Sequence, residues 1–255
     1  PIQVEGGTWV VSDGHWKYQD RDGAFLTSLW ATINTRVYCF DASGFMRTGW
    51  YKENGTWYRL AATGQRLGGW YTEGGTWFYL DPQSGEMITG PIMLGGLEYY
   101  LHPNGAMATG WVHHAHRWHF YSASGAGVRG WLADRGTWYY LDPQSGVMQT
   151  GFITVNGVDY YLQPTGAMAT GWVQHADGWR LYESFGAMKH GWVRLGYSWY
   201  YLQPDSGVML AATTQTIDGR SQTFMPNGEW VGYRAPAGYR QPVQSITPLG
   251  NSTNT

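Results

Sequence analysis

Pairs of tryptophans seven residues apart are the side chains whose type and spacing could bind a ligand. A quaternary ammonium cation has no N–H to donate, and the negative face of an aromatic ring attracts it by roughly 0.5 to 2 kcal/mol. No nucleophile, base and orienting group stand together, so we predict binding without catalytic residues or cofactors. The pairs are Trp50 and Trp57, Trp70 and Trp77, Trp111 and Trp118, Trp131 and Trp138, Trp172 and Trp179, and Trp192 and Trp199.

A third aromatic ring follows most of these pairs about twenty residues later. In the next copy of the pattern, this ring stands directly after the position of the second tryptophan. The last pair is the exception, because Gln222 stands at that position. After copies that lack the pair, the same position holds Tyr58, His119 or Arg180. A third aromatic ring is therefore more common after copies that carry a tryptophan pair than after copies that lack it. The third rings are Phe78, Tyr99, Tyr139, Tyr160 and Tyr200, and methionines recur at Met87, Met148, Met188 and Met209.

The elements that must position these rings are short repeats. Units of 20 or 21 residues, about ten or eleven copies, cover residues 5–231 with the pattern GW-x4-G-x-WYYL-x-P-x-SG-x-M-x-T. Alternation in "TWYYL" predicts a strand, and "ENGT", "EGGT" and "VNGV" predict the tight turn of a hairpin. A lone hairpin is marginal in water, so the hairpins must stack on one another as in a solenoid. We expect an all-β repeat domain over 1–231, with a cap near 212–231, and a linker toward another domain over 232–255.

The copies without the tryptophan pair form a second, longer period. They begin at Trp30, Pro91, Phe152 and about Ala212, which is a spacing of three units or about 61 residues. If successive hairpins are rotated by about a third of a turn, units three apart lie on the same side. One side would then lack the pairs, and the other two would carry ladders of them.

Composition limits the other possibilities. The net charge is −2 and no basic block is present, which argues against a nucleic-acid ligand. No apolar run approaches the roughly 20 residues of a membrane span, and no signal peptide opens the chain, which suggests a piece of something longer. With 16 Trp and 19 Tyr, aromatic residues rather than aliphatic ones are expected to supply the buried area. The single cysteine, Cys39 in "VYCF", is expected to be a small buried side chain.

The repeat at 131–152, with its Gly-Trp, "TWYYL" and methionine in fixed spacing, resembles the choline-binding or cell-wall-binding repeats of bacterial surface proteins and phage lysins. Related repeats occur in glucan-binding domains and clostridial toxins. The resemblance implies a left-handed β-solenoid with about three hairpins per turn. It also implies that choline lies between consecutive hairpins, held by two tryptophans, one ring of the next hairpin and often a methionine. The matching positions are Trp50, Trp57 and Phe78; Trp70, Trp77, Met87 and Tyr99; Trp111, Trp118 and Tyr139; Trp131, Trp138, Met148 and Tyr160; and Trp172, Trp179, Met188 and Tyr200.

Some units depart from this pattern. Pro91 and Phe152 replace the tryptophan of Gly-Trp, and Glu98 and Asp159 replace the second tryptophan. Sites that open from these two units are not expected to bind choline, and the site after Trp192 and Trp199 is expected to be incomplete.

The resemblance implies a secreted, wall-associated, non-catalytic module that anchors a larger protein, such as a wall hydrolase, to choline on teichoic acid. A carbohydrate-binding module is the main alternative, because aromatic platforms stack on sugars and Gln83, Gln144, Asp142 and Gln203 could bind hydroxyl groups. A protein-adhesion surface or inert stalk is a third possibility, in which the tryptophans only pack hairpins together.

The segment "HHAHRWH" places His113, His114, His116 and His119 in one hairpin, which raises the possibility of zinc. Equivalent segments of other units, such as "KENGTW", have no such set. We therefore expect no metal site.

Overall fold

The computed structural model describes residues 1–232, which contain twenty-three short strands and no helix. The predicted all-β class and the repeated hairpins are confirmed. Within the described residues no helix is long and apolar enough to cross a membrane. The strands are β1 (Ile2–Val4), β2 (Thr8–Ser12), β3 (His15–Gln19), β4 (Leu29–Ile33), β5 (Arg36–Phe40), β6 (Gly49–Glu53), β7 (Thr56–Leu60), β8 (Gly69–Glu73), β9 (Thr76–Leu80), β10 (Gly90–Leu94), β11 (Leu97–Leu101), β12 (Gly110–His114), β13 (Arg117–Tyr121), β14 (Gly130–Asp134), β15 (Thr137–Leu141), β16 (Gly151–Val155), β17 (Val158–Leu162), β18 (Gly171–His175), β19 (Gly178–Tyr182), β20 (Gly191–Leu195), β21 (Ser198–Leu202), β22 (Thr213–Ile217) and β23 (Arg220–Phe224).

The chain divides into two compact units, and the boundary passes through β12 and β13. The first unit comprises Pro1–Val112 and Tyr121–Gly127, and the second comprises His113–Phe120 and the chain from Val128 onward. The expected cap at 212–231 contains the hairpin β22–β23 in the second unit. Beyond Gly232, the expected linker at 232–255 lies outside the described residues.

Nine of the eleven hairpins in the described residues are closed by a two-residue turn with two successive positive φ angles, as the sequence predicts; the turns at residues 176–177 and 196–197 differ. Between β6 and β7, Asn54 and Gly55 both have positive φ, 49° and 83°. Two successive positive φ angles define a type I′ turn, whose twist matches that of the strands. The register follows directly, and Glu53 pairs with Thr56 and Lys52 with Trp57.

The centre of the stack is aliphatic as well as aromatic. The last residue of the second strand is fully buried in most hairpins, and six of these residues are leucines with no exposed surface. The expectation that aromatic residues supply the buried area was therefore wrong for this position. Rings take the same buried strand-end position in other hairpins, at Phe40, Tyr121, Tyr182 and Phe224, whereas several tryptophans are exposed. The six leucines are Leu60, Leu80, Leu101, Leu141, Leu162 and Leu202.

A backbone hydrogen bond joins each hairpin to the loop that follows the next one. The amide of Met87 donates to the carbonyl of Trp57, and the amide of Met107 donates to that of Trp77, both at 2.8 Å. The residue at this place, which is a methionine after most hairpins, is therefore held against the hairpin before it. Its side chain lies under a glycine of the following loop, and a Cβ added at Gly105 would overlap the sulfur of Met87.

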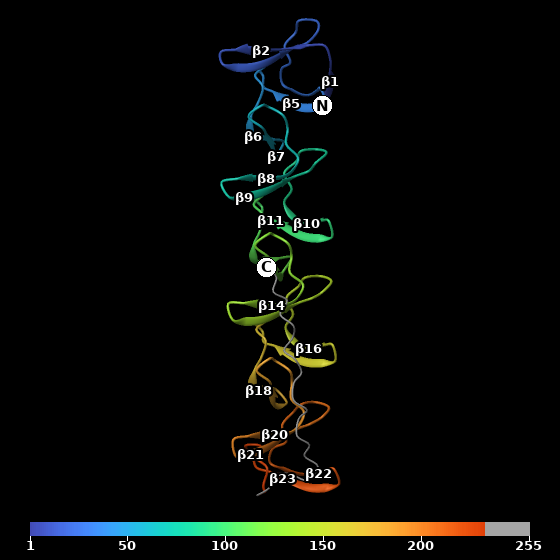
Figure 1. Cartoon of the computed structure of the whole chain (residues 1–255), viewed down its shortest axis with the longest axis vertical. Helices are drawn as coiled ribbons and strands as arrows, with labels where there is room; N and C mark the ends of the chain where they lie inside the picture. The colour runs from blue at the N-terminus through green and yellow to red at the C-terminus, as the bar shows by residue number, and fades with distance from the viewer. Residues whose placement is uncertain (233–255) are drawn as a thin grey trace. The chain divides into compact units, whose positions relative to one another are not determined.

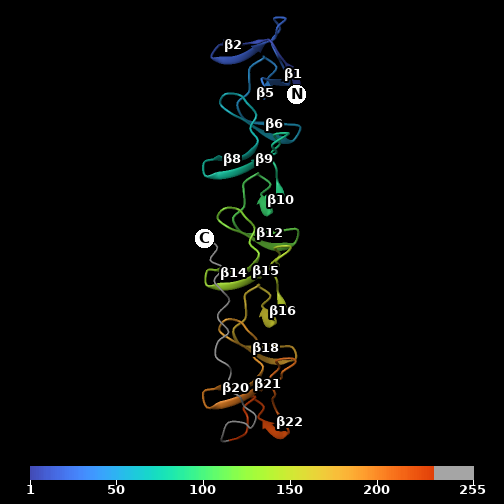
Figure 2. The same cartoon turned by 45° about the vertical axis from the view of Figure 1, so that its right-hand side comes forward.

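Hairpins three apart project to the same side within each unit (Figure 1). In the first unit β2 and β8 share a side, and in the second unit β14 and β20 do, as Figure 2 also shows. This arrangement agrees with the triplet period of the sequence.

Cys39 lies inside the first unit, as expected, and is 3% exposed. Burial raises the pKa of its thiol to about 11. A thiol whose pKa is higher in the folded state favours folding below its unfolded pKa, and this contribution is lost as the pH rises through the folded pKa.

We expect Gly105→Ala to destabilise the protein more than Gly96→Ala. Both glycines have positive φ, 88° and 80°, so the backbone strain is similar. Only the methyl group at 105 would meet the Met87 side chain, and overpacking costs about 1 to 3 kcal/mol. Denaturant unfolding of both variants measures the difference. Equal losses would contradict the packing of glycine on methionine.

We expect the wild type to lose stability between about pH 9 and 11 relative to Cys39→Ala, because only the wild type has this buried thiol. The measurement is the difference in unfolding free energy between the two proteins at each pH, in which the effects of titrating tyrosines cancel. A difference that does not vary with pH would contradict the assignment.

Candidate functional site

Two cavities in the first unit are bounded by a tryptophan pair, a ring of the next hairpin and a methionine. One, of about 280 Å³, is lined by Trp70, Trp77, Tyr99, Met107, Ala123 and Ser124. The other, of about 340 Å³, is lined by Trp9, Trp16, Tyr38, Met46, Ala62 and Thr63. Each therefore draws on two successive hairpins and on the loops after the second and third. No charged side chain lines either cavity.

The rings of these cavities meet at steep angles. The centroids of Trp70 and Trp77 are 6.3 Å apart with planes at 86°, and Tyr99 lies 5.1 Å from Trp70 at 66°. Trp9, Trp16 and Tyr38 repeat this geometry, with 6.5 Å and 88° in the pair and 4.9 Å and 65° to the third ring. Rings at right angles form the walls of a box, in which one small group can contact several ring faces.

The second tryptophan of each of these pairs forms the outer wall. Trp77 is 43% exposed and Trp16 is 46% exposed, whereas Tyr38 and Trp9 are more buried. The rings are therefore accessible from solvent, which side chains that only fill a core would not be.

The first of the two cavities contains three of the predicted residues but not the predicted methionine. Met107 lines it, whereas Met87 is bonded through its amide to Trp57 and packs near Phe78. The methionine lies in the loop after the second hairpin, one repeat later than the sequence assignment. The same correction applies to three other sites. The amide of Met148 bonds the carbonyl of Trp118, that of Met168 bonds Trp138, and that of Met209, not Met188, bonds Trp179.

The site at Trp9 and Trp16 was not predicted from the sequence. The signal was present, since these tryptophans are seven residues apart and Tyr38 follows Trp16 at the spacing that separates Tyr99 from Trp77. The divergent sequence "TWVVSDGHWKY" hid the match to the consensus.

The other predicted groups come together to different extents. Trp50, Trp57 and Phe78 form the same box, with 6.3 Å in the pair and 5.0 Å to Phe78. Trp131 and Trp138 are 6.5 Å apart. Tyr160 is 4.8 Å from Trp131 and almost fully buried, and this burial raises the pKa of Tyr160.

Two further predicted groups contain an exposed second tryptophan. Trp172 lies 5.4 Å from Tyr200, and Trp179 is exposed. Trp118 is exposed as well, and Tyr139 is half-buried.

The last group is closed by the chain itself. Trp230 takes the place of the methionine, with its amide bonded to the carbonyl of Trp199, and it lies 6.0 Å from Trp192. Its indole N–H donates to Gln222, the residue at the third-ring position. This filling explains why the terminal repeat diverges in sequence.

Acidic side chains fix two of the inner tryptophans. The indole N–H of Trp50 donates to Glu73 at 2.8 Å, and that of Trp30 donates to Glu53 at 2.8 Å. Lys52 lies across the strand pair from Trp57, with its ammonium 5.6 Å from the ring centroid. The orientation of these indoles is therefore set by hydrogen bonds, and Glu73 also forms an ion pair with Arg59 at 3.3 Å.

The histidines of "HHAHRWH" are only partly gathered. The rings of His114 and His119 stack at 3.8 Å, and His113 lies 4.9 Å from Trp118. The expectation that no metal binds here stays a prediction.

Two repeat-family models match the chain. The model described as a choline-binding repeat matches residues 108–150. The model described as a cell wall binding repeat matches residues 48–65, 68–87, 150–168 and 190–209. Both describe binding repeats rather than a catalytic domain.

Solved structures match the chain over most of its length. CbpJ from Streptococcus pneumoniae is 28% identical, with 89% of this chain and all of that chain covered and a TM-score of 0.60. Choline binding protein F from the same species is 27% identical, with 90% and 100% covered and a TM-score of 0.58. The modular autolysin LytC of that species shares the fold at 22% identity, with 90% and 53% covered and a TM-score of 0.61. A comparison with curated protein sequences gave no match.

The exposed second tryptophans should be oxidised first when the folded protein is treated with N-bromosuccinimide. Peptide mass mapping should find Trp16 and Trp77 modified before Trp9 and Trp50, because the latter are half-buried. Uniform oxidation of all four would contradict the geometry of open outer walls and covered inner ones.

Proposed function

We propose that the aromatic cavities of this chain, whose repeats match models of choline-binding and cell wall binding repeats, bind choline groups of teichoic acid. The observation that carries this proposal is the composition of the cavity walls. The cavity at Trp70, Trp77 and Tyr99 offers three rings, a thioether and small side chains. Such walls suit a cation that cannot donate hydrogen bonds, because ring faces attract its charge without needing an N–H.

The affinity of one cavity should be modest and that of the array high. Three ring contacts, less the cost of immobilising the ligand, suggest a dissociation constant on the order of millimolar for one free headgroup. A polymer that carries many headgroups can occupy several cavities at once, and linked sites gain about a hundredfold or more. An array of equivalent cavities is therefore suited to a decorated polymer.

We propose that the hairpins of each unit wind as a left-handed β-solenoid with about three hairpins per turn. The hydrogen bonds between hairpin and following loop, and the common side of hairpins three apart, support this arrangement. In the bacterial envelope, the module would anchor a larger secreted protein to the cell wall. A structure of choline binding protein F in the presence of a peptidoglycan analogue is among the matches, which is consistent with work at the wall.

A carbohydrate ligand is the second candidate, and one groove favours it. A cavity of about 420 Å³ in the first unit is lined by Thr35, Arg36, Gln65, Arg66 and Gln83 among others, so it offers several hydrogen-bonding groups for hydroxyls. This groove contains no tryptophan, which weakens it as a sugar platform.

Free choline at about 100 mM should raise the melting temperature of the full chain and elute it from a quaternary-amine resin. At 100 times the dissociation constant, each occupied site adds about 2.7 kcal/mol of stability. Choline should also protect Trp16 and Trp77 from oxidation.

The matched variants are Trp77→Ala, which removes one wall of a cavity, and Tyr197→Ala, which removes an aromatic ring that is 99% exposed and lies in no cavity described above. Trp77→Ala should lower the number of choline sites by one, measured by equilibrium dialysis, and Tyr197→Ala should leave it unchanged. Stabilisation by dextran or wall polysaccharide with no response to choline would instead favour the carbohydrate function.

A further inference from the structure

The hairpin that begins at Trp30 has an arginine where its neighbours have a methionine. The amide of Arg66 donates to the carbonyl of Val37 at 2.7 Å, as that of Met46 donates to Trp16 and that of Met87 to Trp57. A glycine covers it in the same way, because a Cβ added at Gly85 would overlap the Cδ of Arg66. Arg66 therefore occupies the position that a methionine holds in most other sites. In this site, the position of the second tryptophan is held by Val37.

The guanidinium of Arg66 lies inside this site. It is 5.9 Å from the ring centroid of Trp30, and its Nη2 donates to the carbonyl of Gln83 at 2.7 Å. Tyr58 supplies the third ring, 5.1 Å from Trp30. The surrounding cavity, of about 460 Å³, is also lined by Glu53 and Glu86. A cation of the chain itself thus lines a site that also holds two rings and two carboxylates.

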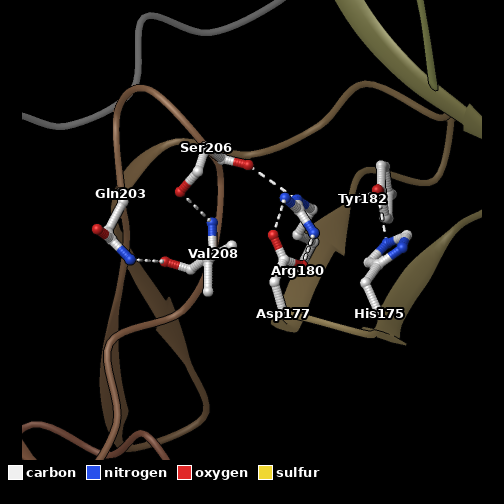
Figure 3. A network of polar contacts seen from close by, with 7 residues as sticks. All are labelled: His175, Asp177, Arg180, Tyr182, Gln203, Ser206 and Val208. Carbon is white, nitrogen blue, oxygen red and sulfur yellow. Dashed lines mark hydrogen bonds and ion pairs between the residues drawn. The ribbon is translucent and has the colours of Figure 1, made fainter.

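The site of the hairpin that begins at Phe152 also contains an arginine, but this arginine comes from a different position in the repeat. Arg180 stands at the third-ring position, and its guanidinium lies 4.9 Å from the ring centroid of Phe152. It is 7% exposed and is fixed by Asp177 and by the carbonyl of Ser206, at 2.7 and 2.8 Å (Figure 3). Asp159 replaces the second tryptophan, and Met188 is held at the methionine place by its bond to the Asp159 carbonyl.

A longer loop accompanies these arginines at every third repeat. In the loops 81–87, 142–148 and 203–209, the amide of the first residue bonds the carbonyl five residues on, whereas the loop at 41–46 closes after four. Each longer loop accepts a hydrogen bond from an arginine, and three different sequence positions supply it. The pairs are Arg66 with Gln83, Arg129 with Gln144 and Arg180 with Ser206.

Cations also lie near one tryptophan pair, but at other places. Lys52 and Arg59 lie over Trp57 and Trp50, yet each is the cross-strand neighbour of its ring in the same hairpin. Neither takes the methionine or third-ring place, which Met87 and Phe78 hold. An arginine takes one of those places at the hairpins that begin at Trp30 and Phe152, whereas Gly127 and His119 take them at the hairpin that begins at Pro91.

We propose that Arg66 and Arg180 are resident cations that exclude quaternary ammonium ligands from the sites at Trp30 and Phe152. The proposal rests on the function proposed above and assigns specificity within it. A tethered guanidinium is present at an effective concentration of millimolar or more, comparable with the dissociation constant expected for choline. Its positive charge also offsets the carboxylates that line the site, so a choline cation is attracted less strongly there than the carboxylates alone would attract it. Choline is thereby confined to the sites with tryptophan pairs.

The test is to convert the resident-cation site at Trp30 into an open one. Val37→Trp with Arg66→Met restores the missing ring and the methionine while Trp30, Tyr58, Glu53 and Glu86 remain. Equilibrium dialysis of the full chain with radiolabelled choline should then count one more site than in the wild type. Arg36→Met is the control, because it removes an exposed arginine of the neighbouring groove without opening the site, and its count should equal that of the wild type.

A second pair of substitutions, in the other unit, tests the same proposal if the first variant does not fold. Asp159→Trp with Arg180→Tyr restores both rings beside Phe152 and Met188, and it too should add one choline site. Circular dichroism and the melting temperature identify whichever variant is folded. If the wild type binds choline and neither folded conversion adds a site, the resident-cation proposal is overturned. If the wild type and the conversions all fail to bind choline, that proposal and the proposed function both fail.

Discussion

The hydrogen bond from the residue at the methionine place to the carbonyl one hairpin earlier sets how hairpins stack within each unit. It recurs from Met46 bonded to Trp16 through to Trp230 bonded to Trp199, and it fixes how far each hairpin advances over the last. A glycine beneath each following loop lets the backbone approach the side chain at that place. The tryptophan pair of one hairpin therefore always faces the third ring of the next at nearly the same distance, 4.8 to 5.4 Å in five sites. The cavities are a product of this spacing, and side-chain identity decides only whether each is open, closed or occupied.

Local features of the fold could be predicted because they depend on neighbours in the chain. The type I′ turns follow from Asn-Gly and Gly-Gly, and the ring pairs follow from a strand period of two across a short hairpin. The triplet period was visible because hairpins three apart experience the same surroundings. The assignment of Met87 failed because sequence order does not tell which earlier hairpin a loop contacts. That contact depends on the hydrogen bond between loop and hairpin, and only coordinates supply it.

The aliphatic column was the other feature that composition concealed. Aromatic residues dominate the count, yet Leu80 and Leu141 at the strand ends have no exposed surface, whereas Trp77 remains open to solvent. A leucine fits the narrow interior between stacked hairpins, where an indole would overfill the space. The tryptophans are thereby left to form walls nearer the surface, so a sequence unusually rich in tryptophan need not depend on tryptophan for its centre. The two tasks, cohesion and recognition, fall to different residues of the same five-residue strand.

Each aromatic cavity takes parts from three successive repeats, and this sharing constrains how such a chain can grow. The cavity at Trp70 and Trp77 is completed by Ala123 and Ser124, more than forty residues further on. A duplication of one hairpin would change which loops and arginines lie next to each tryptophan pair, and several sites would lose a partner at once. A duplication of three hairpins would preserve every partnership and add whole sites. The 61-residue spacing is therefore the smallest step by which the array could lengthen without loss, and its C-terminal end must carry repeats that complete an earlier cavity and own none themselves.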